Sequence, residues 1–197
     1  MKLKTLVSGV ALTIAVTALS VGCSNQPSDE SPSTAHTATS SASLPPDSLP
    51  VRMKSEIKKG VGFSVRDATD LGRTVDLQHA ELWRFCLSRK GDGPDSVDLG
   101  AVPYGEKCPT HWAAHVPTLK TPSVIGQSFE HAYDTLLKKG YNSRFIDVFY
   151  GNGGAVDQQD IPRVDGEVCK QYPQPGQPFD PSENVKLYVA VGKCPHT

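Results

Sequence analysis

The sequence has little of what marks several common protein classes. Its 197 residues contain 20 basic and 21 acidic side chains, so no charge of one sign dominates, and aromatic residues make up only 7%. This balance excludes a strongly basic nucleic-acid-binding protein and a strongly acidic solvating chain. Hydrophobic residues make up 38%, which excludes a protein with several membrane spans.

The common catalytic and nucleotide-binding motifs are also missing. No G-x-S-x-G, H-E-x-x-H or phosphate-loop motif occurs. Ser55 to Lys58 match the S-x-x-K motif of penicillin-binding enzymes, but S-D-N is absent and the chain is too short for that fold. We interpret this stretch as a solvated helix that ends at Gly60. Asp157, Asp160 and Asp165 lack the spacing of a calcium loop and are interpreted as solvated acids. We therefore expect a non-enzymatic protein without cofactor or metal, and an unrecognised enzyme is the alternative.

The N-terminal residues have the pattern of an export signal. Lys2 and Lys4 precede an uncharged run at 5–22, and Gly22 stands immediately before Cys23. A basic start, an apolar run and small residues at a cleavage site are typical of a secretory signal. The Gly-Cys end resembles the lipobox of bacterial lipoproteins, which implies removal of residues 1–22 and lipidation of Cys23. The alternatives are an uncleaved anchor, because about 18 apolar residues approach the length that spans a bilayer, and ordinary secretion.

Residues 23–47 are predicted to be a disordered tether behind the lipidated cysteine. The segment is rich in Ser, Thr and Pro, and Leu44 is its only apolar side chain larger than Ala. Such a segment cannot bury enough apolar surface to offset its chain entropy. Without residues 1–22 the chain has 18 basic and 21 acidic residues, a net charge of −3. Such a net charge does not draw a protein to anionic lipid, so attachment is expected to depend on the lipid chains.

The remaining chain contains a weak internal repeat. Four short matches recur in the same order, at spacings between 80 and 88 residues. They pair 58–60 with 138–140, 85–86 with 168–169, 97–99 with 185–187, and 105–109 with 192–195. We therefore predict two units, 48–115 and 116–197, each small enough to need covalent staples.

The second unit is predicted to have the element order β-α-β-β-β. A short strand at 122–126 precedes a helix at 128–140, with Ser128 as N-cap and Gly140 after its C-terminus. Three strands follow, near 145–149, 167–172 and 185–191. The last of these alternates apolar with polar or small residues, which is typical of a strand with one buried face.

These residues resemble the PASTA domain, an extracellular repeat of bacterial serine/threonine kinases and some penicillin-binding proteins. The resemblance rests on P-x-V-x-G at 122–126, on Q-x-P-x-P-G at 171–176, and on V-x-L-x-V at 185–189 followed by Gly192. It implies an α+β fold in which each unit packs a helix on a three-stranded sheet. The first unit is matched only through the internal repeat, as a divergent PASTA-like unit.

Four cysteines lie outside the lipobox, and in an exported protein we expect them to be oxidised. Three pairings are possible. The repeat selects Cys86–Cys108 and Cys169–Cys194, because each pair then occupies the same two places in its unit. A zinc site at Cys108, His111 and His115 is the alternative, but it lacks a fourth ligand.

Several aromatic and amide side chains suit a sugar-binding face, although we expect most of the aromatics to fill the two cores. They are Tyr150, Asn152, Tyr172, Tyr188, Trp83 and Trp112. No ligand-binding residues are assigned from the sequence.

The resemblances together imply a lipoprotein on the extracellular face of the cytoplasmic membrane that binds peptidoglycan, muropeptides or a wall-synthesis partner. The alternative is a protein-binding accessory subunit that regulates a kinase or a penicillin-binding protein and has no wall ligand of its own.

Overall fold

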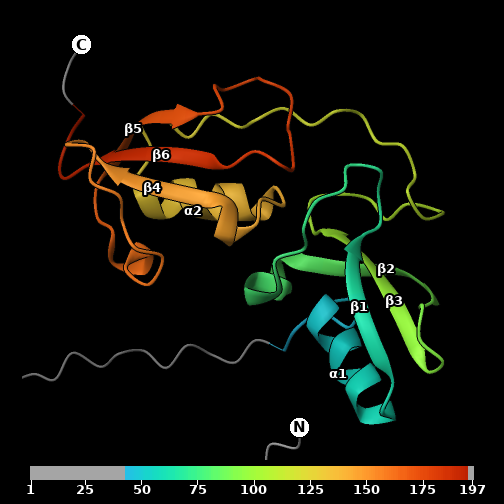
Figure 1. The fold of residues 1–197 in the computed structure, drawn as a ribbon. Coiled ribbons are helices and arrows are strands. Elements are labelled where there is room, and N and C mark those ends of the chain that lie inside the picture. The colour runs from blue at the N-terminus through green and yellow to red at the C-terminus, as the bar shows by residue number, and fades with distance from the viewer. Residues whose placement is uncertain (1–42, 195–197) are drawn as a thin grey trace, which may run out of the picture. The chain divides into compact units, whose positions relative to one another are not determined.

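The computed structural model describes residues 43–194 (Figure 1). The predicted signal at 1–22, the lipidation site Cys23 and most of the predicted tether lie outside the described residues. Within the part of the chain that is described, no helix is long and apolar enough to cross a membrane.

The first unit packs one helix on a three-stranded sheet. Helix α1 (Leu49–Lys59) is followed by β1 (Gly62–Asp67), the 3-10 helix η1 (Leu77–Leu82), β2 (Trp83–Lys90) and β3 (Ser96–Pro103). The strand order is β1-β3-β2, with β3 parallel to β1 and antiparallel to β2. Helix α1 ends at Gly60, whose φ of 70° is the left-handed conformation that glycine adopts without strain.

The second unit has the same topology. Helix α2 (Phe129–Lys138) is followed by η2 (Ser143–Phe145), β4 (Ile146–Tyr150), η3 (Ile161–Arg163), β5 (Glu167–Tyr172) and β6 (Val185–Ala190). Its strand order is β4-β6-β5, with β6 parallel to β4 and antiparallel to β5. The predicted α+β class, with a helix on a three-stranded sheet in each unit, is confirmed.

The strand registers show that the two units correspond residue by residue. The β2–β3 ladder shifts between Phe85 and Leu87, and the β5–β6 ladder shifts between Val168 and Lys170, so the bulge falls on a cysteine in both units. The residue before each helix also forms the same isolated bridge, Ser48 with Arg84 and Ser128 with Glu167. The repeat inferred from short sequence matches is therefore present in the hydrogen-bond ladders.

The strand predicted at 122–126 is wrong, and the element order of the second unit is α-β-β-β. This segment runs alongside β5 but does not form a regular ladder with it. The N–H of Val124 donates to the side chain of Gln171, at 2.8 Å, and the N–H of Gly126 donates to the carbonyl of Val168 at 2.8 Å. The side chain of Gln171 therefore accepts the hydrogen bond that a backbone carbonyl of a neighbouring strand would accept in a regular ladder.

Each unit has its own apolar core, and the second core is the larger. The first contains Leu49, Val75, Ala80, Trp83 and Ala101. The second is formed by residues of α2 and all three strands, together with Val124, Tyr141, Ile161 and Val164. Leu82 at the end of η1 packs against both cores, so the 3-10 helix of the first unit contacts the second.

Candidate functional site

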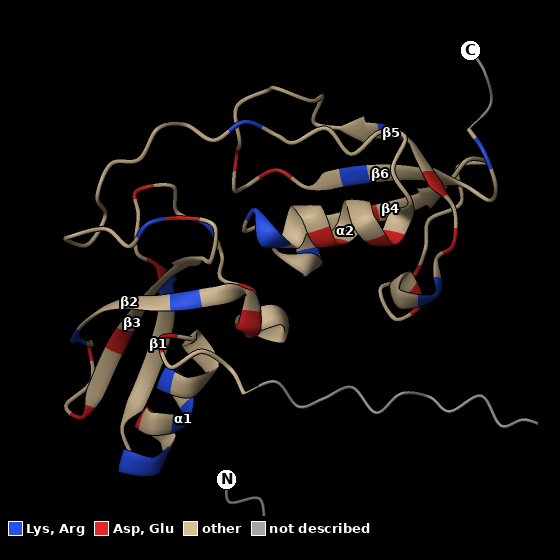
Figure 2. Cartoon of the chain, turned by 180° about the vertical axis from the view of Figure 1, so that it is seen from behind, with Lys and Arg blue, Asp and Glu red and all other residues tan. Residues whose placement is uncertain are grey.

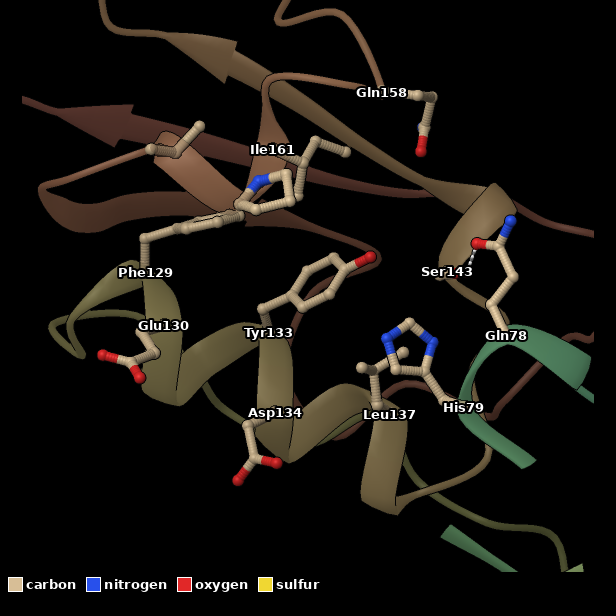
Figure 3. Close-up of a pocket in the computed structure, with 12 residues that line it drawn as sticks. Gln78, His79, Phe129, Glu130, Tyr133, Asp134, Leu137, Ser143, Gln158 and Ile161 are labelled. Carbon is tan, nitrogen blue, oxygen red and sulfur yellow. Dashed lines mark hydrogen bonds between the residues drawn. The ribbon is translucent and has the colours of Figure 1, made fainter. Parts of the chain in front are cut away.

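A groove of about 720 Å³ lies beside α2 (Figure 3). One side of it is α2, and the rest comes from η1, from Ser143 at the start of η2, and from the loop that contains η3. The lining residues are Gln78, His79, Phe129, Glu130, Tyr133, Asp134, Leu137, Ser143, Gln158, Ile161, Pro162 and Val164.

Apolar side chains form much of the groove. Phe129, Tyr133 and Leu137 are spaced four residues apart and therefore share one face of α2. The ring of Tyr133 lies between those of Phe129 and His79 in Figure 3, at centroid distances of 5.6 and 6.4 Å. Aromatic and aliphatic surface of this kind binds the apolar part of a ligand.

Asp76 positions the polar side of the groove. Its carboxylate accepts hydrogen bonds from the N–H of Gln78 and of Ser143, both at 2.9 Å, and lies 3.0 Å from Nδ1 of His79. Burial raises the pKa of Asp76, but the hydrogen bonds from Ser143, His79 and Gln78 outweigh burial, and the net pKa is below its ordinary value. The carboxylate is therefore ionised at neutral pH and holds three groove residues in place.

The hydroxyl of Tyr133 is a neutral hydrogen-bonding group at neutral pH. Burial, and to a lesser degree the negative charge of Asp76, raises the pKa of Tyr133. The amide side chains of Gln78 and Gln158 add donors and acceptors to the same groove. On the open side, Glu130 and Asp134 are acidic, and Asp134 pairs with Lys138 at 2.6 Å. This lining suits the binding of a small ligand with both apolar and hydrogen-bonding groups.

The cysteines predicted to pair lie together. The Sγ atoms of Cys86 and Cys108 are 1.98 Å apart, and those of Cys169 and Cys194 are 2.10 Å apart. Both pairs are at disulfide distance, in the combination that the repeat selects. Cys108 is thus engaged with Cys86, and Nδ1 of His115 lies 2.6 Å from Asp70, so these groups do not assemble the zinc site considered as the alternative.

The aromatic residues considered for a sugar-binding face do not gather in the groove. Trp83 is 1% exposed and belongs to the first core, as expected for most of these aromatics. The indole of Trp112 lies against Gly100, and Tyr188 stacks on Phe149 with 5.2 Å between ring centroids. Tyr150 and Tyr172 are exposed.

Sequence reasoning missed most of the groove. Tyr133 follows the helical spacing of the apolar residues of α2, and in the structure its side chain is half-buried and lines the groove. Gln78, His79 and Gln158 had no local signal, because they are brought to α2 only by tertiary packing.

A buried glutamine explains why the motif residues of the second unit belong together. Gln171 is 0% exposed. Its Oε1 accepts from Val124, and its Nε2 donates to the carbonyls of Pro122 and Pro173 at 2.9 and 3.1 Å. The P-x-V-x-G segment and the Q-x-P segment are thus joined through one side chain.

Residues 119–191 match the family model of the PASTA domain. The PASTA domain is a binding and sensing module, so the match supports a binding role related to the cell wall or to a kinase or penicillin-binding protein. The matched range includes α2 and the whole second sheet, and with them ten of the twelve groove residues, all except Gln78 and His79. No curated protein and no solved structure matches the chain significantly.

Proposed function

We propose that this protein is a non-enzymatic envelope lipoprotein that binds peptidoglycan fragments through the groove beside α2. In this proposal Cys23 bears the lipid, residues 24–47 form the tether, and the protein lies on the extracellular face of the cytoplasmic membrane. The observation that supports binding is the groove itself, because it lies on a PASTA domain and combines aromatic surface with amide and hydroxyl groups.

The ligand suits such a groove for a chemical reason. A muropeptide contains amide bonds, hydroxyl groups and small apolar side chains within one flexible molecule. Gln78, Gln158 and Tyr133 supply donors and acceptors for the polar groups, and Phe129 and Leu137 supply apolar surface.

Sedimentation with purified peptidoglycan tests this proposal. A chain of residues 24–197, which has no lipid, is expected to pellet with the insoluble wall material. Gln78→Trp should reduce the bound fraction several-fold, because Gln78 is exposed at the groove and an indole would occupy the space of the ligand. Gln174→Trp is the matched control, since Gln174 is an exposed glutamine of the second unit that does not line the groove.

Three other outcomes of the sedimentation experiment would contradict parts of this proposal. Equal loss in both variants would contradict the groove as the binding site. A wild-type chain that stays in the supernatant would contradict wall binding and favour the alternative, an accessory subunit for a kinase or a penicillin-binding protein. Muropeptides released into the supernatant would reveal an enzyme.

A further inference from the structure

The charge of the protein is unevenly distributed, and helix α1 is the more basic of its two described α-helices. Residues 49–59 contain four basic side chains and one acid, which gives +3, whereas the equivalent residues 129–139 of the second unit contain two of each. The chain from Cys23 onward has a net charge of −3, so the rest of it totals −6. Figure 2 shows the basic positions in blue along α1, down to its C-terminal end.

The basic side chains of α1 divide into two sets. Arg52 and Lys59 both pair with Glu56, at 2.8 and 3.1 Å. Lys54 and Lys58 are exposed, and neither forms an ion pair with any residue that the structure describes. Two free ammonium groups four positions apart therefore lie on one solvent-facing side of the helix.

Apolar side chains lie on the same exposed side. Val51 is 40% exposed and Ile57 is 64% exposed, and each is three positions from Lys54. Spacings of three and four residues place Val51, Lys54, Ile57 and Lys58 beside one another on the helix surface. We name these four residues the α1 face. Lysines interspersed with exposed apolar groups are typical of a helix that lies on an anionic bilayer surface.

The chain that precedes α1 keeps this face near the membrane if Cys23 bears the lipid. The segment 24–48 separates Cys23 from the first residue of the helix. If residues 24–42 form the tether that the sequence predicts, a flexible chain of 19 residues has an end-to-end distance of roughly 22–26 Å. Tethering at such a distance raises the effective concentration of the partner surface to the millimolar range, so weak contacts become significant.

We propose that the α1 face docks on the anionic surface of the membrane to which the protein is tethered. The occupant is a bilayer surface that contains anionic phospholipid, and Lys54 and Lys58 contact its phosphate groups while Val51 and Ile57 enter the interface. The net charge of −3 does not oppose this contact, because surface potentials act only within about 8–10 Å and α1 itself carries +3. This proposal rests on the lipid anchor of the proposed function only because the anchor raises the effective concentration of the bilayer surface near α1.

Vesicle binding by the lipid-free chain 24–197 tests the docking separately from the anchor. The chain is expected to pellet with vesicles of equal phosphatidylglycerol and phosphatidylcholine, to stay in solution with phosphatidylcholine alone, and to be released at about 0.5 M salt. Lys54→Gln with Lys58→Gln should weaken binding at least ten-fold, because each lysine contributes about five-fold near an anionic surface. Lys120→Gln with Lys139→Gln is the control, since it makes the same charge change at exposed lysines of the second unit.

Three results would overturn the docking. They are the absence of binding to anionic vesicles, equal weakening by the control variant, and displacement from vesicles by soluble poly(glycerol phosphate) at the same phosphate concentration. The last result would assign the α1 face to an anionic wall polymer.

A tethered measurement completes the test. Residues 23–197 are coupled through the thiol of Cys23 to a maleimide lipid, and amide hydrogen exchange is compared on the two kinds of vesicle. Slower exchange in α1 on anionic vesicles supports docking, and equal exchange contradicts it. Peptidoglycan sedimentation of the same variants should be unchanged, so failure of wall binding and failure of docking are distinguishable.

Discussion

Val124 and Gln171 lie 47 positions apart, yet the backbone N–H of Val124 donates to Oε1 of Gln171 at 2.8 Å. The side chain amide of Gln171 therefore takes the place of a neighbouring strand for the segment that enters the second unit. This explains how an extended segment with apolar Val124 in the core is held without a regular ladder.

Replacement of this glutamine should destabilise the second unit. Gln171→Leu leaves the N–H of Val124 and the carbonyls of Pro122 and Pro173 without their partner in a buried place. Because each unsatisfied buried group costs free energy, we expect a loss of about 2–4 kcal/mol in the free energy of unfolding. Urea unfolding measures it, with Gln174→Leu at an exposed position as the control. Equal effects of the two variants would show that the hydrogen bonds of Gln171 contribute nothing.

The buried ion pairs of Arg73 should contribute more to the free energy of unfolding than an ion pair at the surface does. Nε of Arg73 lies 2.7 Å from Asp67 and Nη1 lies 2.6 Å from Glu106, and the arginine side chain is 1% exposed. Arg73→Met should lower the free energy of unfolding by about 3–5 kcal/mol, because the carboxylate of Asp67 would remain buried without its cation. Arg163→Met removes the exposed pair with Asp160 and should change stability by less than about 1 kcal/mol. Thermal unfolding compares the two, and similar shifts would refute the distinction.

The two disulfides should act locally, with Cys86 joined to Cys108 and Cys169 to Cys194. They close loops of 22 and 25 residues, and each should contribute about 3 kcal/mol. Cys169→Ser with Cys194→Ser should speed amide hydrogen exchange in the second sheet and leave the first sheet protected. Peptide mapping without reduction identifies the pairs. A linked peptide from both units, or four free thiols, would disprove this pairing.

Stability should depend on the ionisation of Asp76. Its pKa is lowered in the folded state, so its carboxylate stabilises the fold at pH values above the ordinary pKa of about 4, and this contribution is lost as pH falls through the folded pKa. The difference in the free energy of unfolding between the wild type and Asp76→Asn should therefore be largest above about pH 5 and shrink below about pH 3. Asp157→Asn, at an exposed loop position, is the control. A difference that stays constant across this range would contradict the role of the charge.

Lipid attachment should depend on Cys23. In the bacterial host, Cys23→Ala is expected to abolish labelling by a fatty-acid analogue and to leave residues 1–22 uncleaved by the lipoprotein route. Gel mobility and metabolic labelling report the two effects. Label that remains on the variant would disprove lipidation at this residue, and an unlabelled wild type would favour the uncleaved anchor.

Local sequence was sufficient for the helix and the three sheet strands of the second unit and for the arrangement of the repeat. Helix α2 begins after Ser128, whose Oγ accepts from the N–H of His131 at 3.4 Å, and strand β5 has the predicted bounds Glu167–Tyr172. These features depend on caps, turns and alternation within a few residues. The cysteine combination also followed from the sequence, because two copies of one fold place equivalent cysteines at equivalent points of the ladder.

Tertiary structure decided the role of the segment at 122–126 and the composition of the groove. The strand prediction failed because propensity does not reveal that Gln171, distant in sequence, would bond to Val124. Likewise, Asp76 and Ser143 meet at 2.9 Å only after η1 packs against the second unit. Short-range patterns determine which elements form, because capping and alternation act between near neighbours. The partners of buried polar groups depend on how the folded chain brings distant residues together, and that decided where this protein has a groove.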